Sequence, residues 1–344
     1  MNISNLKISN GGLKLQFLAV YMSWKFTIMR SIKTYFRAAF TRESLVILKL
    51  KYVTLMDVPT MVCLPCLKTL QLESVTYVYN ESLQRLLSIC PVLEELSVHF
   101  GNEATVPVFS IIVPSLQILS LFIAADIWHL IRYEIDTPSL KYFKLEDGID
   151  SESYCEIKNM PNLREAYVDA GSITSFKCVV GPITSTKRLT ICLEDNVYGD
   201  GFVLNELEHL KICVCQKNSL NLLAQLLRDS PNLRVLEILY MEGHEDNECD
   251  NLDPWNQPSH VPECLLSSLQ FFKWSQYSGR PQERDIAVYM LKNACRLEKV
   301  TILADTRELY VSNLCMIKEL TLSSRASSTC ELVFAEWHHV VSDE

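Results

Sequence analysis

The stretch that decides the fold is Leu67-Lys-Thr-Leu-Gln-Leu72, with leucines at its first, fourth and sixth positions. The same pattern recurs about twelve times along the chain, at a spacing of roughly 20 to 28 residues, with other apolar or small residues at some positions. The copies begin at Leu45, Leu67, Leu93, Leu116, Leu140, Leu163, Thr186, Leu207, Leu233, Leu269, Leu297 and Ile317.

A repeat of this length and pattern is typical of a leucine-rich-repeat solenoid. The fourth and sixth positions are two residues apart, which is the period of a β-strand, so their side chains point inward and the residues between them face the other way. We therefore predict an α/β fold with a curved parallel sheet, whose convex side carries short helices or loops. Because a single repeat cannot bury its own leucines, stability must come from stacking.

Three connections between the repeats have the apolar spacing of helices, at residues 80–89, 219–228 and 283–294. Asn80 is expected to cap the first helix, and acidic residues are expected in the first turn of the third. The other connections are too short, or too rich in glycine and proline, to predict a full helix.

The charge distribution is uneven. The chain of 344 residues has a net charge of −9, yet residues 1–42 carry seven Lys or Arg and no acid, which leaves 25 basic and 41 acidic residues in the remainder. An acidic body argues against a nucleic-acid partner, which requires a basic surface. No run of 18 apolar residues exists, so we expect no membrane span and no membrane partner.

The thirteen cysteines are an odd number, and several lie in or beside the apolar runs of the repeats. Reduced, buried thiols in an intracellular protein, located in the cytoplasm or nucleus, are the favoured interpretation. A secretory signal around Leu15–Trp24, or an organelle transit peptide in the basic leader, remains an alternative. Cysteines predicted to be buried include Cys63, Cys66, Cys90, Cys192, Cys213, Cys215 and Cys330.

The repeat spacing stretches to 36 residues between Leu233 and Leu269, where acids and prolines accumulate. This composition indicates a linker. We predict five segments: an atypical basic segment at 1–42, leucine-rich repeats at 43–241, an acidic and proline-rich linker at 242–260, a further domain continuing the repeat stack at 261–334, and a tail at 335–344.

Residues 261–305, which begin Val261-Pro-Glu-Cys-Leu-Leu-Ser-Ser-Leu-Gln-Phe-Phe-Lys-Trp274, closely resemble the FBD domain of plant F-box proteins. The segments Asp57-Val-Pro59, Leu64-Pro-Cys-Leu-Lys-Thr-Leu70 and Cys90-Pro-Val-Leu-Glu-Glu-Leu96 are similar to the leucine-rich repeats of the same family. The resemblance implies an FBD-like αβ cap at the C-terminal end. It also implies protein–protein recognition, as the substrate-recognition part of an SCF-type ligase in the ubiquitin conjugation pathway.

Residues 1–42 depart from the family pattern of an F-box, because they show no Leu-Pro start and no paired leucines. Trp24 is the only Trp in this segment, and no Leu-Pro precedes it. Recruitment to a ligase is therefore assigned to no residue of the chain. A Skp-type adaptor and a cullin are expected as partners only if an F-box is supplied or replaced. The alternative is a free-standing scaffold or decoy that binds a target without promoting its degradation.

No catalytic, cofactor or metal site is expected, and neither is enzymatic activity. Cys63-Leu-Pro-Cys66 has redox or zinc spacing but lacks a second pair, so a structural role is favoured. Four potential metal ligands occur in and beside the linker with irregular spacing, and a solvated loop is the favoured interpretation there. They are His244, Cys249, His260 and Cys264.

The candidate site is the concave face, which is expected to bind a target protein of unknown identity. Aromatic and arginine side chains are favoured as anchors of interfaces. An ordinary solvated sheet surface is the alternative. The residues chosen, of which the first five are predicted to form an aromatic patch of mixed charge, are Tyr142, Lys144, Glu165, Tyr167, Arg188, His209 and Lys211.

Overall fold

The computed structural model describes residues 8–9, 12–18, 45–55, 63–79, 81–101, 108–124, 132–148, 154–170, 180–193, 203–216, 219–241, 243–244, 254–305 and 313–337. The chain divides into two compact units, Met1–Ile183 and Thr184–Glu344. The predicted domain bounds at residues 43, 242 and 261 do not coincide with this division and stay a prediction. Most of the basic segment 1–42 and much of the linker lie outside the described residues.

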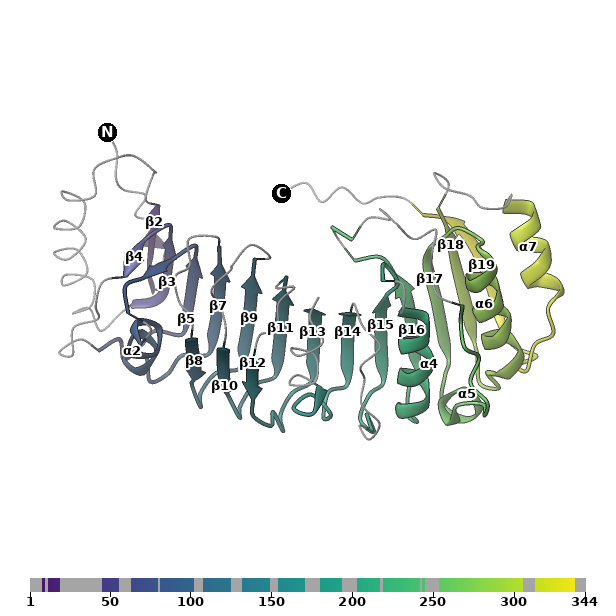
Figure 1. Cartoon of the computed structure of the whole chain (residues 1–344), viewed down its shortest axis with the longest axis horizontal. Coiled ribbons are helices and arrows are strands. Elements are labelled where there is room, and N and C mark those ends of the chain that lie inside the picture. The colour runs from purple at the N-terminus through teal and green to yellow at the C-terminus, as the bar shows by residue number, and fades with distance from the viewer. Residues whose placement is uncertain are drawn as a thin grey trace. The chain divides into compact units, whose positions relative to one another are not determined.

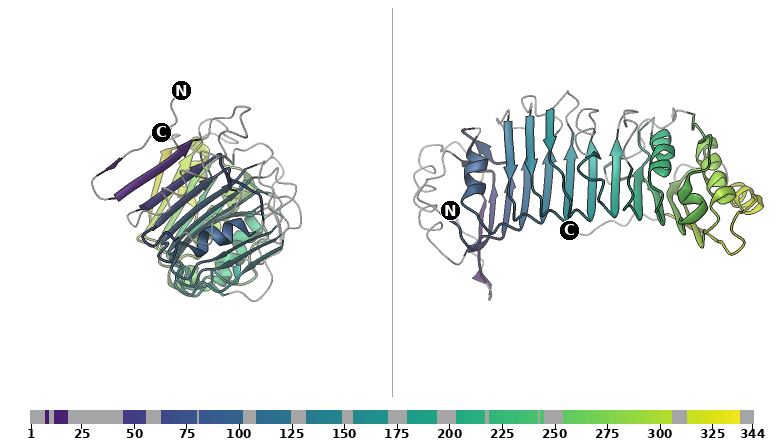
Figure 2. Two further views of the ribbon diagram at one scale, coloured as in Figure 1. Left: turned by 90° about the vertical axis from the view of Figure 1, so that its left-hand side faces the viewer. Right: turned by 90° about the horizontal axis from the view of Figure 1, so that it is seen from below.

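The main sheet of the first unit contains one strand from each repeat. Its strands pair in parallel along the chain, except for the short antiparallel pair β1–β2 at its N-terminal edge. Figures 1 and 2 show these strands side by side in chain order. They are β1 (Ile8–Ser9), β2 (Gly12–Leu18), β3 (Leu45–Lys51), β5 (Thr69–Glu73), β7 (Glu95–Phe100), β9 (Ile118–Ile123), β11 (Tyr142–Asp147) and β13 (Glu165–Ala170).

The repeat pattern places its apolar residues in the core, as predicted. Leu67, Leu70 and Leu72 are at most 2% exposed, and the corresponding residues of the neighbouring repeats are equally buried. Each buried leucine contributes about 1.5–3 kcal/mol. Strand pairing joins equivalent positions, for example Leu70 to Leu96, so the leucines stack from one repeat to the next. The leucine-rich-repeat architecture of the α/β class is confirmed.

A second parallel sheet was not predicted. The segments between consecutive repeats form β8 (Val108–Ile112), β10 (Arg132–Asp136) and β12 (Tyr154–Ile157), and β10 pairs with both neighbours. In Figure 1 their arrows point opposite to those of the main strands. The connections expected to be short helices or loops are therefore strands here, although none of the three is a full helix, as predicted. A shorter pair, β4 (Thr54–Leu55) with β6 (Thr76–Tyr77), follows the same plan.

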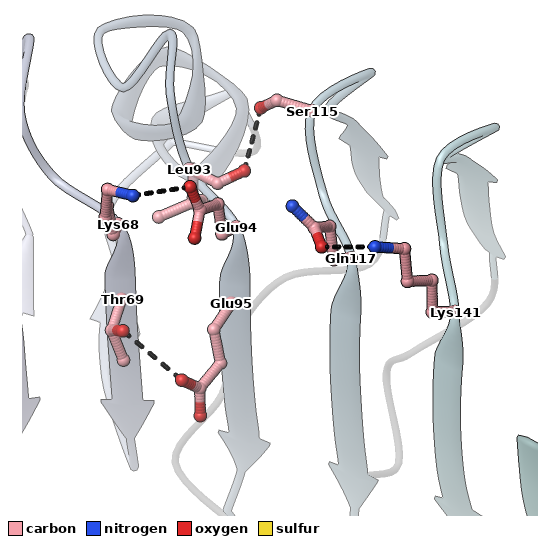
Figure 3. Close-up of polar contacts among 8 residues, drawn as sticks. All are labelled: Lys68, Thr69, Leu93, Glu94, Glu95, Ser115, Gln117 and Lys141. Atoms are coloured by element: carbon pink, nitrogen blue, oxygen red, sulfur yellow. Dashed lines mark hydrogen bonds and ion pairs between the residues drawn. The ribbon is translucent and has the colours of Figure 1, made fainter.

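Polar side chains join neighbouring repeats at the start of the main strands (Figure 3). The Lys68 Nζ atom lies 2.7 Å from Glu94 Oε1, and Lys141 Nζ donates to Gln117 Oε1 at 2.9 Å, each pair at equivalent positions of adjacent repeats. The Ser115 hydroxyl donates to the Leu93 carbonyl at 2.7 Å. The first two bonds join side chains of adjacent repeats, whereas the Ser115 bond satisfies a backbone carbonyl at the turn before a strand.

The second unit has a parallel sheet of its own, in the order β14–β15–β16–β17–β18–β19. A register shift between Ser275 and Tyr277 interrupts the pairing of β17 with β18. The strands are β14 (Arg188–Leu193), β15 (His209–Cys213), β16 (Val235–Leu239), β17 (Phe271–Tyr277), β18 (Lys299–Ala304) and β19 (Glu331–Glu336).

All three predicted helices exist, as α2 (Ser82–Ser88), α4 (Ser219–Asp229) and α6 (Pro281–Asn293). Their apolar residues, such as Leu83 and Leu86 in α2, are buried. The N-cap of α2 is Glu81, so the predicted capping role of Asn80 was wrong, and Asn80 itself lies outside the described residues. The short α5 (Glu263–Ser267) precedes β17.

The twelfth copy of the repeat, which begins at Ile317, was assigned wrongly. It belongs to the helix α7 (Asn313–Leu322), in which Leu320 is buried but Ile317 and Leu322 are exposed. The strand that closes the sheet is β19 instead. Among the described helices, none has the length and apolar character needed to cross a bilayer.

Candidate functional site

The side chains that alternate with the buried ones along the main strands form a surface that we call the open face. In the first unit its central patch lies on β9, β11 and β13, where the registers align three rows of three residues. The rows are Ile118-Tyr142-Glu165, Ser120-Lys144-Tyr167 and Phe122-Glu146-Asp169.

Lys144 is the centre of this patch. Its Nζ atom lies 4.8 Å from the centroid of the Tyr167 ring and 3.1 Å from Glu146 Oε2. These contacts hold the ammonium group between an aromatic face and a carboxylate. Partial burial raises the pKa of Tyr142, so its hydroxyl remains a neutral hydrogen-bonding group at physiological pH.

Apolar side chains border the patch. Ile118 is 40% and Phe122 is 37% exposed, although both are large and hydrophobic. The Phe122 ring lies 4.1 Å from the ring of His99 on the neighbouring strand, and burial is the main cause that lowers the pKa of that histidine. The patch therefore combines aromatic and aliphatic area with three acids and one lysine.

The other three predicted residues lie in the second unit, on β14 and β15. Arg188 and His209 are paired in the register, and Lys211 follows two residues later. His209 Nε2 lies 2.7 Å from Glu237 Oε1 on β16, and Lys211 Nζ lies 3.5 Å from the same oxygen. A further base, Lys273 on β17, lies 3.9 Å from Glu237 Oε2.

Glu237 organises this second group, which we call the Glu237 cluster (His209, Lys211, Glu237 and Lys273). The hydrogen bond from His209 is the main cause that lowers the pKa of Glu237 to about 2, and Lys211 and Lys273 add to it. The carboxylate is therefore ionised throughout the physiological range, and basic residues outnumber acids in this cluster.

The predicted patch consisted of Tyr142, Lys144, Glu165, Tyr167 and Arg188, and the structure brings the first four onto the paired strands β11 and β13. Arg188 belongs to the second unit and pairs with His209 there. The predicted set omitted Ile118, Phe122, Glu237 and Lys273. The signal for all four was their alternation with buried residues, because the outward positions of every strand are fixed by the repeat.

The cysteine and histidine candidates differ in their surroundings. Cys63 and Cys66 are exposed, so their predicted burial was wrong, and the Cys63 thiol contacts the Ile89 carbonyl at 3.7 Å. Among the candidates near the linker, His260 is exposed beside Ser259, whereas Cys264 is buried and donates to the Leu227 carbonyl. Cys249 lies outside the described residues.

His244 has different neighbours from those that the sequence suggested. Its Nδ1 atom lies close to three thiols, 3.3 Å from Cys192, 3.7 Å from Cys213 and 3.2 Å from Cys215. Sequence reasoning missed this group, because its members come from separate repeats and the only local signal is Cys213-Val-Cys215. These four residues could hold a metal ion.

Comparison with known proteins identifies the family. The model described as "FBD-associated F-box protein At5g56370, LRR repeats" matches residues 13–166, and the FBD model matches residues 257–302. In Arabidopsis thaliana, FBD-associated F-box protein At5g38590 is 60% identical over 82% of this chain and 68% of its own length. FBD-associated F-box protein At4g10400 is 51% identical over 86% of this chain and 69% of its own length. The chain therefore belongs to the family of FBD-associated F-box proteins with leucine-rich repeats.

Proposed function

We propose that this chain recognises a target protein through the open face of its repeats, as the substrate-recognition part of an SCF-type ubiquitin ligase. It performs no catalysis of its own. The observation that carries the proposal is the central patch, where Tyr142, Lys144 and Tyr167 are fixed on adjacent strands beside exposed Ile118 and Phe122. Rigid aromatic anchors of this kind provide most of the binding energy at protein interfaces.

The composition of the patch defines the partner that would fit. Apolar side chains of the target would cover Ile118, Phe122 and Tyr142, and basic side chains would meet Glu146, Glu165 and Asp169, which outnumber Lys144. A target segment with aromatic or aliphatic residues flanked by lysine or arginine satisfies both requirements.

An intracellular location, in the cytoplasm or nucleus, is part of the same proposal. No disulfide joins any of the eleven cysteines in the described residues, and five of them are exposed or partly exposed. Exposed free thiols persist in reducing compartments. Family membership supports participation in the ubiquitin pathway, since the names of the relatives contain the words "F-box protein".

The target-binding part is tested by a double variant, Tyr142→Ala with Tyr167→Ala. Proteins captured by the wild-type chain in plant cells are quantified by mass spectrometry, and binding of each candidate is then measured with purified components. We expect the double variant to weaken binding at least about 100-fold, since each anchor contributes about 2 kcal/mol or more. The control is Tyr79→Ala, because Tyr79 is 52% exposed and lies outside the patch.

Unchanged binding by the double variant, with an unchanged unfolding midpoint, would overturn the proposed surface. Ligase assembly is tested separately by mixing the chain with a Skp-type adaptor and a cullin and measuring complex formation by size-exclusion chromatography. A stable complex supports the ligase proposal. Target binding without adaptor binding would instead support the alternative, a scaffold or decoy that does not recruit a ligase.

A further inference from the structure

Four potential metal ligands converge in the second unit. Cys192, Cys213, Cys215 and His244 each direct one donor atom to a common point, and these four atoms all lie within 4.8 Å of one another. Cys192 and Cys213 are buried, whereas Cys215 and His244 are partly exposed.

The repeat itself aligns two of the ligands. Ile191 of β14 pairs with Ile212 of β15, and a cysteine follows each isoleucine directly, so Cys192 and Cys213 occupy equivalent positions of adjacent repeats. β15 ends at Cys213. Cys215 lies two residues further on, and residues two apart in an extended chain point to the same side.

A turn after β16 brings the fourth ligand. The Val214 N–H donates to the Leu239 carbonyl at 3.1 Å, which holds the chain beyond β15 against the end of β16. The His244 N–H donates to the Met241 carbonyl at 3.0 Å, and Gly243 within this turn has a φ of +79°, a conformation that favours glycine. The Met241 N–H in turn points at Cys213 Sγ, at 3.4 Å.

The separations fit a tetrahedral zinc site. With bonds of about 2.3 Å to sulfur and about 2.0 Å to nitrogen, tetrahedral geometry separates two sulfurs by about 3.8 Å and a sulfur from a nitrogen by about 3.5 Å. The three sulfur-to-Nδ1 distances here are 3.3, 3.7 and 3.2 Å, and Cys192 Sγ lies 3.3 Å from Cys215 Sγ. A small expansion of the cluster would accommodate the ion.

We propose that Cys192, Cys213, Cys215 and His244 form a Cys3His site for a structural zinc ion. Thiolate and imidazole donors in this ratio are typical of zinc, and four protein ligands leave no open position for a substrate. The ion would join β14 and β15 to the turn after β16, that is, three consecutive repeats. It would also anchor the chain where the acidic segment from residue 242 begins. No metal site was expected from the sequence, and this proposal departs from that expectation.

The hydrogen bond from Met241 to Cys213 supports this role. Backbone N–H groups commonly donate to metal-bound thiolates, orienting the ligand and reducing its negative charge. With zinc bound, three thiolates and a neutral histidine leave the site with a net negative charge, which such a donor stabilises. The bond therefore fits a deprotonated Cys213 sulfur.

The test uses the full chain, purified under reducing conditions from cells supplied with zinc. Elemental analysis is expected to find about one zinc ion per chain, retained through gel filtration. Replacement by Co²⁺ is expected to give the visible and near-ultraviolet absorption of tetrahedral thiolate coordination. Removal of zinc by a strong chelator is expected to lower the unfolding midpoint by about 5 °C or more.

Variants locate the site. Cys213→Ser and His244→Ala are expected to reduce the zinc content to near zero, whereas His244→Cys retains zinc and strengthens the thiolate-to-cobalt absorption. The matched controls, Cys295→Ser and His260→Ala, replace exposed residues of the same unit and are expected to retain the full zinc content. If Cys213→Ser fails to fold, the spectrum of the cobalt-loaded wild type and the behaviour of His244→Cys still decide the question.

Three results would overturn the proposal. The first is a folded wild-type chain that binds neither zinc nor cobalt. The second is zinc that survives both ligand variants but is lost in Cys63→Ser with Cys66→Ser, since the metal would then be held by that exposed pair. The third is a chain purified without reductant from zinc-supplied cells that is lighter by the two hydrogens of a disulfide, with the peptides of Cys192 and Cys215 joined until a reductant is added.

Discussion

The Nε2 atom of His209 lies 2.7 Å from Oε1 of Glu237, across the neighbouring strands β15 and β16. The register pairs His209 with Val235 and Lys211 with Glu237, so the histidine contact runs diagonally to the strand pairing. Lys273 approaches the same carboxylate from β17. Glu237 therefore contacts three basic side chains on the two neighbouring strands, namely those of His209, Lys211 and Lys273. The Glu237 side chain is only 18% exposed.

This arrangement predicts that Glu237→Gln destabilises the fold in a pH-dependent manner. The pKa of Glu237 is about 2 in the folded chain, below the value of about 4.3 for an unfolded glutamate, so ionisation stabilises the folded state. We expect the variant to lower the free energy of unfolding by about 1–3 kcal/mol at pH 7. The difference from wild type should shrink as the pH falls from about 4.3 toward 2. Urea unfolding followed by tryptophan fluorescence at several pH values measures it.

The control for this experiment is Glu298→Gln, because Glu298 is exposed and lies in the same unit. Its effect on the unfolding midpoint should be small at every pH. A penalty for Glu237→Gln that stayed constant down to pH 2 would show that packing, and not the charge of the carboxylate, stabilises this cluster.

The sequence predicted the main strands well because the first, fourth and sixth positions of each repeat are buried for one physical reason, namely the stacking of neighbouring repeats. The same pattern failed at Ile317, Leu320 and Leu322. A spacing of three residues fits one face of a helix as well as the start of a repeat, so the pattern cannot distinguish α7 from a strand. Only pairing with β18 identifies β19 as the last strand.

A matched pair of leucine substitutions tests this reassignment. Leu236 on β16 is fully buried, whereas Leu322 at the end of α7 is 74% exposed, although both stand at the fourth or sixth position of the apparent repeat. We expect Leu236→Ala to lower the free energy of unfolding by about 2–5 kcal/mol, and Leu322→Ala to lower it by less than about 0.5 kcal/mol. Urea unfolding of the two variants provides the comparison. Similar losses for both would contradict the helical assignment of the twelfth copy.

The second sheet of the first unit was missed, although its strands alternate clearly. Phe109 and Ile111 are buried, as are Tyr133 and Ile135 in the next connection. These strands are only four or five residues long, and short alternating runs between stronger repeats are ambiguous on their own. The aromatic rings stack in the core: the Phe109 ring centroid lies 4.6 Å from that of Phe100 and 5.4 Å from that of Tyr133. No local sequence pattern predicts this stacking.

The substitution Tyr133→Phe tests the contact between the two sheets. The Tyr133 hydroxyl donates to Asp147 Oδ2 at 3.2 Å, and both residues are buried. We expect Tyr133→Phe to lower the free energy of unfolding by about 1.5–3 kcal/mol, because a buried carboxylate loses a donor while the ring packing is kept. Tyr142→Phe is the control, since it removes a hydroxyl from the open face. Equal effects of the two variants would indicate that the Asp147 bond contributes nothing specific.

The candidate site, too, could be predicted only where its residues lie on the regular strands of the repeat. Tyr142, Lys144 and Tyr167 could be grouped because the repeat fixes both the strand and the face of each residue. The Cys192–His244 group could not, because Cys215 lies beyond the end of β15 and His244 lies in a turn after β16. Residues outside the regular strands have no period from which to predict their direction.

The buried carboxylate of Glu283 holds the loop that precedes α6, and its replacement should be among the most damaging in the chain. Its Oε2 atom accepts hydrogen bonds from the N–H groups of Ser278, Gly279 and Arg280, at 3.0, 2.8 and 3.1 Å, and from the Ser278 hydroxyl at 3.1 Å. Glu283 is 1% exposed, so water cannot replace it.

We expect Glu283→Ala to lower the free energy of unfolding by about 3 kcal/mol or more, because three backbone donors lose their acceptor in the interior. Glu283→Gln keeps one acceptor oxygen and should cost less. Asp285→Asn is the control, since Asp285 lies two residues further along α6 and its side chain is 60% exposed. Hydrogen exchange of the Gly279 and Arg280 amides should accelerate in Glu283→Ala. Unchanged exchange there, together with unchanged stability, would mean that the loop is held by the register shift of β17 and by the packing of Tyr277 instead.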